Sequence, residues 1–187
     1  MVELFNDHAE DIEYSGLVFD LKRPTVSEFR VLEHTVNTVL IQVAEGSTYE
    51  VRDGKFNWTG DIGTGAMMVQ QAYPENGSCV RMGFDWNPLR AAEKAEDRGK
   101  GQVLLSWKDN NYGLRKGQQY HFRSVVRDLV GVHNARCNNI VIRDCDFYAL
   151  SNMGFVSQFT DKITYQRVNV APPKGSIRTC PAWGDIF

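Results

Sequence analysis

Five side chains of this sequence have the types and the placement that chemistry or ligand binding would need. His133 and Gln158 each lie near the start of a repeated segment, and Arg178, Trp183 and Asp185 follow in a loop-rich stretch. A carboxyl group such as that of Asp185 can give or take a proton, and an aromatic face such as that of Trp183 can stack on a ligand. From the residue types alone, a structural role in supporting turns is the simpler interpretation.

A pattern that occurs three times predicts the elements that would position these side chains. Its copies run from Ile12 to Phe19, from Ile140 to Phe147 and from Ile163 to Val170, and the last two start 23 residues apart. Within a copy, apolar residues follow at steps of two, three and two, whereas a flat strand keeps a step of two. The chain must therefore bend inside each copy. Short strands joined by bends and repeated in this way predict the coils of a right-handed parallel β-helix.

The long separation between the first two copies indicates an insertion. We expect residues 1–24 to form a first coil, residues 25–122 an inserted domain, and residues 123–187 further coils that are truncated at the C-terminus. Within the insertion, Asp53–Gly54 predicts a tight hairpin turn, and the stretch Leu89–Asp97, rich in Ala, Glu, Lys and Arg, predicts a short helix. Short strands with turn signals dominate the rest. The predicted fold class is all-β: a right-handed parallel β-helix with an inserted small antiparallel β-barrel domain.

Glycines extend the repeat beyond one strand. Gly131 precedes the second copy and Gly154 precedes the third, again 23 residues later. Because glycine reaches φ values that other residues avoid, we expect both glycines at the bends between coils.

Cysteines and histidines do not predict a metal site. The sequence contains no CxxC pair and no histidine at the spacing of a zinc finger, although it has four cysteines: Cys79, Cys137, Cys145 and Cys180. Cys145 occupies the apolar position that Leu17 and Val168 fill in the other copies, so we expect a buried thiol there. We expect neither a metal nor a cofactor.

Composition excludes several classes of partner. The chain has 187 residues, of which 42% are hydrophobic, and a formal net charge of −2. This balance gives no electrostatic reason to expect nucleic acid or an anionic membrane as a partner. No apolar run approaches the roughly 20 residues of a transmembrane helix, and residues 1–8 lack the basic and apolar regions of a signal peptide.

Several motifs resemble those of glycoside hydrolase family 110, which contains exo-acting α-1,3-galactosidases, among them enzymes that act on blood group B antigens. The motifs are Phe19–Phe29, Trp86–Arg90, Gly154–Gln158, Val168–Pro173 and Arg178–Asp185. The resemblance implies a parallel β-helix with inserted β-barrel domains, hydrolysis with inversion, and no metal or cofactor. It also implies a galactose-terminated oligosaccharide or glycoconjugate as the substrate, and a secreted or periplasmic location.

The resemblance assigns a catalytic role to one of the five candidate residues, and the other four are candidates from their types and positions. Asp185 matches an acidic position of the family signature and is expected to act as the general acid or the general base. The second catalytic carboxylate is expected beyond residue 187, so the chain is expected to be an N-terminal portion of the enzyme. Trp183, Arg178, Gln158 and His133 are the expected substrate-binding residues. Whether the protein forms a homo-oligomer is left open.

Two alternatives remain open at this point. The chain could belong to another β-helix enzyme such as a polysaccharide lyase, although the sequence lacks the clustered acids of a Ca²⁺ site. It could also be a non-catalytic, carbohydrate-binding β-helix fragment. Release of galactose from an α-1,3-linked galactoside distinguishes these alternatives from a galactosidase.

Overall fold

The chain forms two compact units in a computed structural model that describes residues 2–59, 70–73, 78–81, 87–123, 130–151 and 153–182. Unit 1 comprises Met1–Thr25, Val126–Lys174 and Cys180–Phe187, whereas unit 2 comprises Val26–Val125 and Gly175–Thr179. Each unit has its own hydrophobic core.

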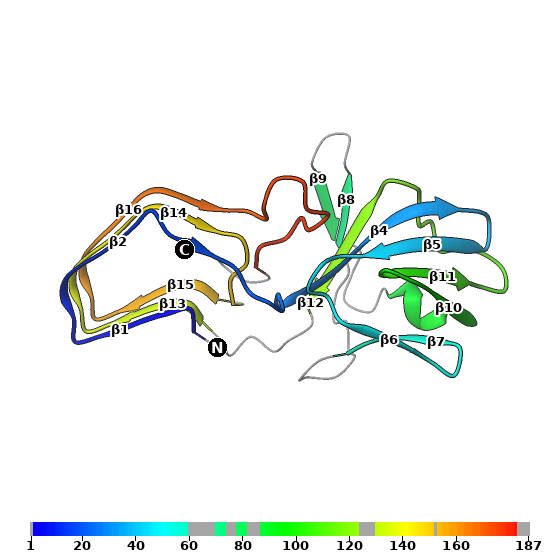
Figure 1. Cartoon of the computed structure of the whole chain (residues 1–187), viewed down its shortest axis with the longest axis horizontal. Coiled ribbons are helices and arrows are strands. Elements are labelled where there is room, and N and C mark those ends of the chain that lie inside the picture. The colour runs from blue at the N-terminus through cyan, green and yellow to red at the C-terminus, as the bar shows by residue number, and fades with distance from the viewer. Residues whose placement is uncertain are drawn as a thin grey trace. The chain divides into compact units, whose positions relative to one another are not determined.

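Parallel strands build unit 1 (Figure 1). One sheet has the order β1-β13-β15, with β1 at Leu4–Asp7, β13 at Val130–Ala135 and β15 at Met153–Gln158. The other has the order β16-β14-β2, with β2 at Glu10–Ser15, β14 at Asn138–Phe147 and β16 at Asp161–Val170. The short strand β3, Val18–Phe19, also pairs with β14.

The three sequence copies lie side by side in this second sheet. Ile140 of β14 pairs with Ile12 on one side and with Ile163 on the other. The middle copy supplies the centre of the core, because Ile140, Cys145 and Phe147 are fully buried. As expected, the Cys145 thiol is enclosed, and its Sγ donates to the carbonyl oxygen of Arg143 at 3.2 Å.

Residues with positive φ values form the bends of unit 1. The bend that the three-residue step predicts falls at Gly16, Asp144 and Arg167, whose φ values are 68°, 54° and 51°. Two further aligned groups have the same conformation: His8, Arg136 and Phe159, and Asp11, Asn139 and Lys162. A left-handed residue costs a non-glycine side chain about 1 kcal/mol or more, so strand pairing on both sides of each bend must offset that cost.

Gly131 and Gly154 do not form bends, and the expectation that they do is wrong. They lie opposite each other within the paired strands β13 and β15. A Cβ atom on Gly131 would stand 2.7 Å from Leu150 Cδ2 and 2.8 Å from the Gly154 carbonyl oxygen. Glycine is therefore required at position 131 for close packing rather than for an unusual φ.

Unit 2 contains a seven-stranded antiparallel sheet with the order β10-β11-β5-β4-β12-β8-β9 (Figure 1). Its strands are β4 (Val26–His34), β5 (Thr38–Val43), β8 (Gln70–Tyr73), β9 (Ser78–Arg81), β10 (Lys94–Gly99), β11 (Gln102–Ser106) and β12 (Gln119–Arg123). A separate hairpin joins β6 (Tyr49–Arg52) to β7 (Lys55–Trp58). Its predicted turn is confirmed, because Asp53 and Gly54 both have positive φ values.

The predicted helix at Leu89–Asp97 is wrong. Only a short 3-10 helix, η1, spans Pro88–Ala91, and the chain then continues as strand β10. Ala95 is buried between two exposed or half-buried neighbours, as in a strand with one covered face. Pairing of β10 with β11 therefore overrides the local helix propensity of Ala, Glu and Lys.

The predicted architecture is also wrong, although the all-β class is confirmed. The strands in the described ranges form separate small sheets of three, four, seven and two strands, and those of unit 2 do not close into a barrel. A parallel β-helix with an inserted β-barrel is therefore not what the chain forms. The physical reason is that three sequence copies supply at most three layers of parallel strands, whereas the long segment between the first two copies pairs antiparallel.

A buried polar cluster connects the sheet of unit 2 to the segment Gly175–Thr179 by hydrogen bonds. Glu28 of β4 is only 1% exposed, and its Oε2 accepts bonds from the amide and the hydroxyl of Thr179, each at 2.7 Å. His121 of β12 pairs with Glu28 across the sheet and lies 3.5 Å from the Thr179 hydroxyl. Gln119 also donates to the carbonyl oxygen of Ile177. The segment Gly175–Thr179 is thus held by side chains of β4 and β12.

The described residues contain no helix that is long and apolar enough to cross a membrane.

We predict that Gly131→Ala destabilises unit 1 by about 1–3 kcal/mol, because the added methyl group meets a backbone oxygen that cannot move aside. Chemical unfolding followed by circular dichroism measures the change. Val130→Ala in the same strand is the control and should cost less. Equal stability of Gly131→Ala and the unmodified protein would contradict the packing argument.

We predict that acid weakens unit 2 through His121. Burial lowers the pKa of this imidazole from 6.5 to about 4. Between these two pH values the unfolded chain binds a proton at His121 and the folded chain does not. The free energy of unfolding should fall by about 3 kcal/mol as the pH drops from 6.5 to 4. Urea titrations followed by tryptophan fluorescence test this.

His121→Gln should lose that part of the pH dependence, whereas His34→Gln, at an exposed histidine, should keep it. An identical pH dependence in both variants would show that other groups cause the acid sensitivity.

Candidate functional site

His133 and Gln158 meet on the outer side of the sheet β1-β13-β15. Phe5, His133 and Val156 pair across the three strands, so their side chains point to the same side. Gln158 lies two positions after Val156 and therefore also points outward. We call these four residues the His133 face. The structure thus brings together two of the five residues that the sequence singled out.

The polar and aromatic groups of the His133 face contact one another. His133 Nε2 lies 3.2 Å from Gln158 Oε1. Because an amide oxygen only accepts, this contact is a hydrogen bond when Nε2 carries the proton. The Phe5 and His133 rings lie 5.4 Å apart between centroids, and Phe5 is 59% exposed. The face therefore offers an apolar ring beside hydrogen-bonding groups.

Buried amides behind this face hold its strands in register. Asn6 Nδ2 donates to Asn134 Oδ1 at 2.8 Å, and Asn134 Nδ2 donates to Ser157 Oγ at 3.2 Å. Tyr14 OH donates to Asn6 Oδ1 at 2.7 Å. These hydrogen bonds favour one register of the strands that carry His133 and Gln158.

Glu3 is a carboxyl group that the sequence reasoning missed. Its Oε1 accepts from the amide and the hydroxyl of Ser151, each at 3.0 Å, and its own amide donates to the Gly131 carbonyl oxygen. Burial raises the pKa of Glu3 above its ordinary value, and these hydrogen bonds oppose the rise only in part. Glu3 precedes the first repeat, so no pattern in the sequence marks it.

Phe5 was missed for a similar reason. It stands between Leu4 and Asn6, which are half-buried and buried, so alternation alone places it outward. That signal becomes visible only once the pairing of β1 with β13 is known.

The remaining candidates are not joined to the His133 face by the structure. Arg178 belongs to unit 2, where its amide donates to Ser176 Oγ at 3.0 Å. His133 and Gln158 belong to unit 1. Trp183 and Asp185 lie outside the described residues. Within the described ranges, no group of three or more His, Cys, Asp or Glu side chains could hold a metal ion.

Comparison with known proteins gives the following relationships. No family model matches the chain. Alpha-1,3-galactosidase A of Akkermansia muciniphila is 31% identical over 180 residues, which cover 96% of this chain and 30% of that protein. Alpha-1,3-galactosidase A of Bacteroides thetaiotaomicron is 28% identical over 188 residues, which cover 100% of this chain and 32% of that protein. The protein of the same name from Streptomyces avermitilis is 22% identical over 189 residues, which cover 94% of this chain and 30% of that protein.

The similarity extends along nearly the whole chain, and the same protein name recurs in relatives from different bacteria. The chain spans about a third of the length of these relatives. These relatives support the glycoside hydrolase family that the motifs of the chain predicted, and they carry the name of alpha-1,3-galactosidases.

Proposed function

We propose that this protein removes terminal α-1,3-linked galactose from glycans of the blood group B type, with inversion at the anomeric carbon. The observation that supports this proposal is the similarity to alpha-1,3-galactosidase A over 96% of the chain. The motif resemblance supports inversion and substrate type. The substrate is a galactose-terminated oligosaccharide or glycoconjugate, and because such glycans lie outside the cytoplasm, the protein is proposed to act in the periplasm or after secretion.

Sugar contact is the role that we propose for the His133 face. A galactose ring has an apolar side that stacks on aromatic rings, and Phe5 offers such a ring to solvent. Its hydroxyl groups both donate and accept hydrogen bonds, and His133 and Gln158 supply both kinds of partner. Arg178 and Trp183 are proposed as further contacts because they precede Asp185 in the sequence and have side chains that suit hydrogen bonding and stacking.

Catalysis by inversion needs two carboxyl groups about 6.5–9.5 Å apart, one to protonate the leaving oxygen and one to activate water. Asp185 is proposed as one of them, because it matches the acidic position of the family motif. The other is expected outside this chain, in the remaining length that the relatives possess.

We predict that a protein spanning the full length of the relatives releases galactose from an α-1,3-linked galactosyl galactoside. Proton NMR should show β-galactose as the first product, because inversion reverses the α configuration. Asp185→Asn should lower kcat by roughly 10²–10⁴-fold, the usual contribution of a general acid or base.

An α-1,4-linked galactoside serves as the specificity control. A correctly folded full-length protein that binds the α-1,3-linked substrate without cleaving it would replace the hydrolase proposal with carbohydrate binding alone. A near-normal rate for Asp185→Asn would remove that residue from catalysis.

We predict that Gln158→Ala raises KM of the full-length protein by about fivefold with a smaller change in kcat, because one hydrogen bond to bound sugar is worth about 1 kcal/mol. The matched control is Gln166→Ala, which removes an exposed glutamine from β16. If the two variants have the same KM, the His133 face does not bind the substrate.

A further inference from the structure

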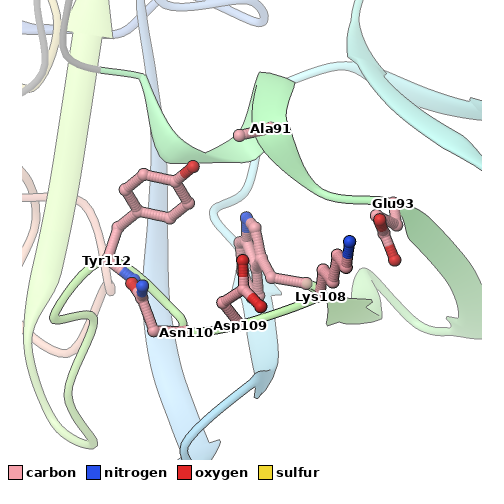
Figure 2. A pocket seen from close by; sticks show the side chains of 7 residues that line it. Ala91, Glu93, Lys108, Asp109, Asn110 and Tyr112 are labelled. Carbon is pink, nitrogen blue, oxygen red and sulfur yellow. The ribbon is translucent and has the colours of Figure 1, made fainter.

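A polar pocket of about 220 Å³ lies in unit 2, and none of the described residues assigned above lines it. It is formed where the chain leaves β11 at Trp107, passes through Asp109 and turns at Tyr112, facing η1 and Glu93. Figure 2 shows Tyr112 at one end and Glu93 at the other, with Asp109 and Lys108 between them. Its volume is below the roughly 300–1,000 Å³ of pockets for drug-sized ligands, so it suits one small ring.

Trp107 lies at the base of the pocket and is held in place. The residue is only 4% exposed, and its indole Nε1 donates to the Pro88 carbonyl oxygen at 2.9 Å. The Trp107 amide donates to the Asn37 carbonyl oxygen at 2.9 Å. With its ring and its backbone both held, Trp107 does not have to reorganise when a ligand binds.

Tyr112 is presented to solvent by a strained backbone. It has a φ of 56° and is 49% exposed, although a bulky side chain in the left-handed region costs about 1–2 kcal/mol. Buried Asn111 offsets this cost by donating to the carbonyl oxygens of Thr35 and Leu114, at 2.8 and 3.1 Å. The Tyr112 amide also donates to Asn110 Oδ1 at 2.9 Å. The loop thus holds an accessible aromatic ring in one place.

Charged side chains around the pocket are available to a ligand. Glu93, Lys108 and Asp109 are exposed and form no ion pair with any part of the chain that the structure describes. Together they provide two carboxylates and one ammonium group, so the pocket has acceptors, donors and a formal charge of −1.

These groups favour a neutral polyhydroxyl ligand over an ion. The formal negative charge disfavours phosphate and other anions. A Ca²⁺ ion needs six to eight oxygen ligands, whereas the pocket offers two carboxylates, an amide oxygen that already accepts from Tyr112, and a lysine that repels cations. A sugar ring matches the combination, since its apolar side can stack on Tyr112 while its hydroxyl groups bond to Asp109, Lys108 and Glu93.

We propose that this pocket is a non-catalytic binding site for one neutral pyranose unit of a glycan. It goes beyond the proposed hydrolase function, because it belongs to unit 2 and uses none of the residues assigned to hydrolysis. A glycan bound there through one of its sugar residues would stay near the protein. This increases the effective concentration of its terminal galactose residues at the site of hydrolysis.

NMR titration of this chain with methyl α-galactoside tests the proposal. The indole Nε1–H resonance of Trp107 should shift on binding, with a dissociation constant on the order of 1 mM. Tyr112→Asn should weaken binding at least tenfold, and asparagine tolerates the left-handed backbone, so the loop is retained. Tyr112→Phe keeps the ring and should bind within about threefold of the unmodified chain.

Phe159→Ala is the matched control, because it removes an aromatic side chain that is 88% exposed but lies in unit 1. Asp109→Asn, which leaves the loop backbone unchanged, should weaken binding several-fold and gives a second test if Tyr112→Asn does not fold.

The proposal is overturned if methyl α-galactoside, methyl α-glucoside and methyl α-mannoside all leave the Trp107 resonance unshifted. It is equally overturned if Tyr112→Asn and Asp109→Asn bind like the unmodified chain, or if Ca²⁺ or phosphate shifts the resonance when the sugars do not. Because the readout is binding by this chain, its failure is distinct from a failure of galactose release.

Discussion

Parallel pairing on both sides of β14 is the interaction on which the rest of unit 1 depends. Ile12, Ile140 and Ile163 are held in one row by this pairing, and the side chains of β14 become the centre of the core. The outer strands cannot bury their own apolar faces as completely: Ile163 and Val168 of β16 are only half-buried, whereas Ile140 and Cys145 are buried. The same register continues past the bends into β13 and β15, which is why His133 and Gln158 come within hydrogen-bonding distance.

The sequence predicted those features of the fold that come from local spacing. The three-residue step predicted the bends at Gly16 and Asp144, because an apolar side chain can return to the core only if the backbone changes direction. Asp53–Gly54 predicted a hairpin turn, because few other dipeptides adopt two positive φ values at low cost. The buried thiol of Cys145 followed from its place in the repeat.

Features that depend on distant partners could not be predicted in the same way. The stretch Leu89–Asp97 has helical propensity, but β11 supplies a strand partner that decides the outcome. Gly131 is constrained by Leu150, which the repeat does not contain. At the candidate site, His133 and Gln158 were recognisable from the repeat, whereas Phe5 and Glu3 gained significance only through pairing with β13. Arg178 sits in a short segment held by Glu28 and Gln119 of unit 2, a connection that sequence proximity to Trp183 does not suggest.

The antiparallel pairing of β4 with β12 has a consequence for how the chain folds. Val26 pairs with Arg123, so the first and last strands of the long intervening segment are neighbours. Before that pairing forms, bringing Ile12 to Ile140 requires closing a loop that is far longer than the one between Ile140 and Ile163, and each doubling of loop length costs about 0.6 kcal/mol. Once unit 2 has folded, it spans most of that loop and leaves only short connections to close. From loop-closure entropy we expect β14 to pair with β16 before the N-terminal strands join the sheet.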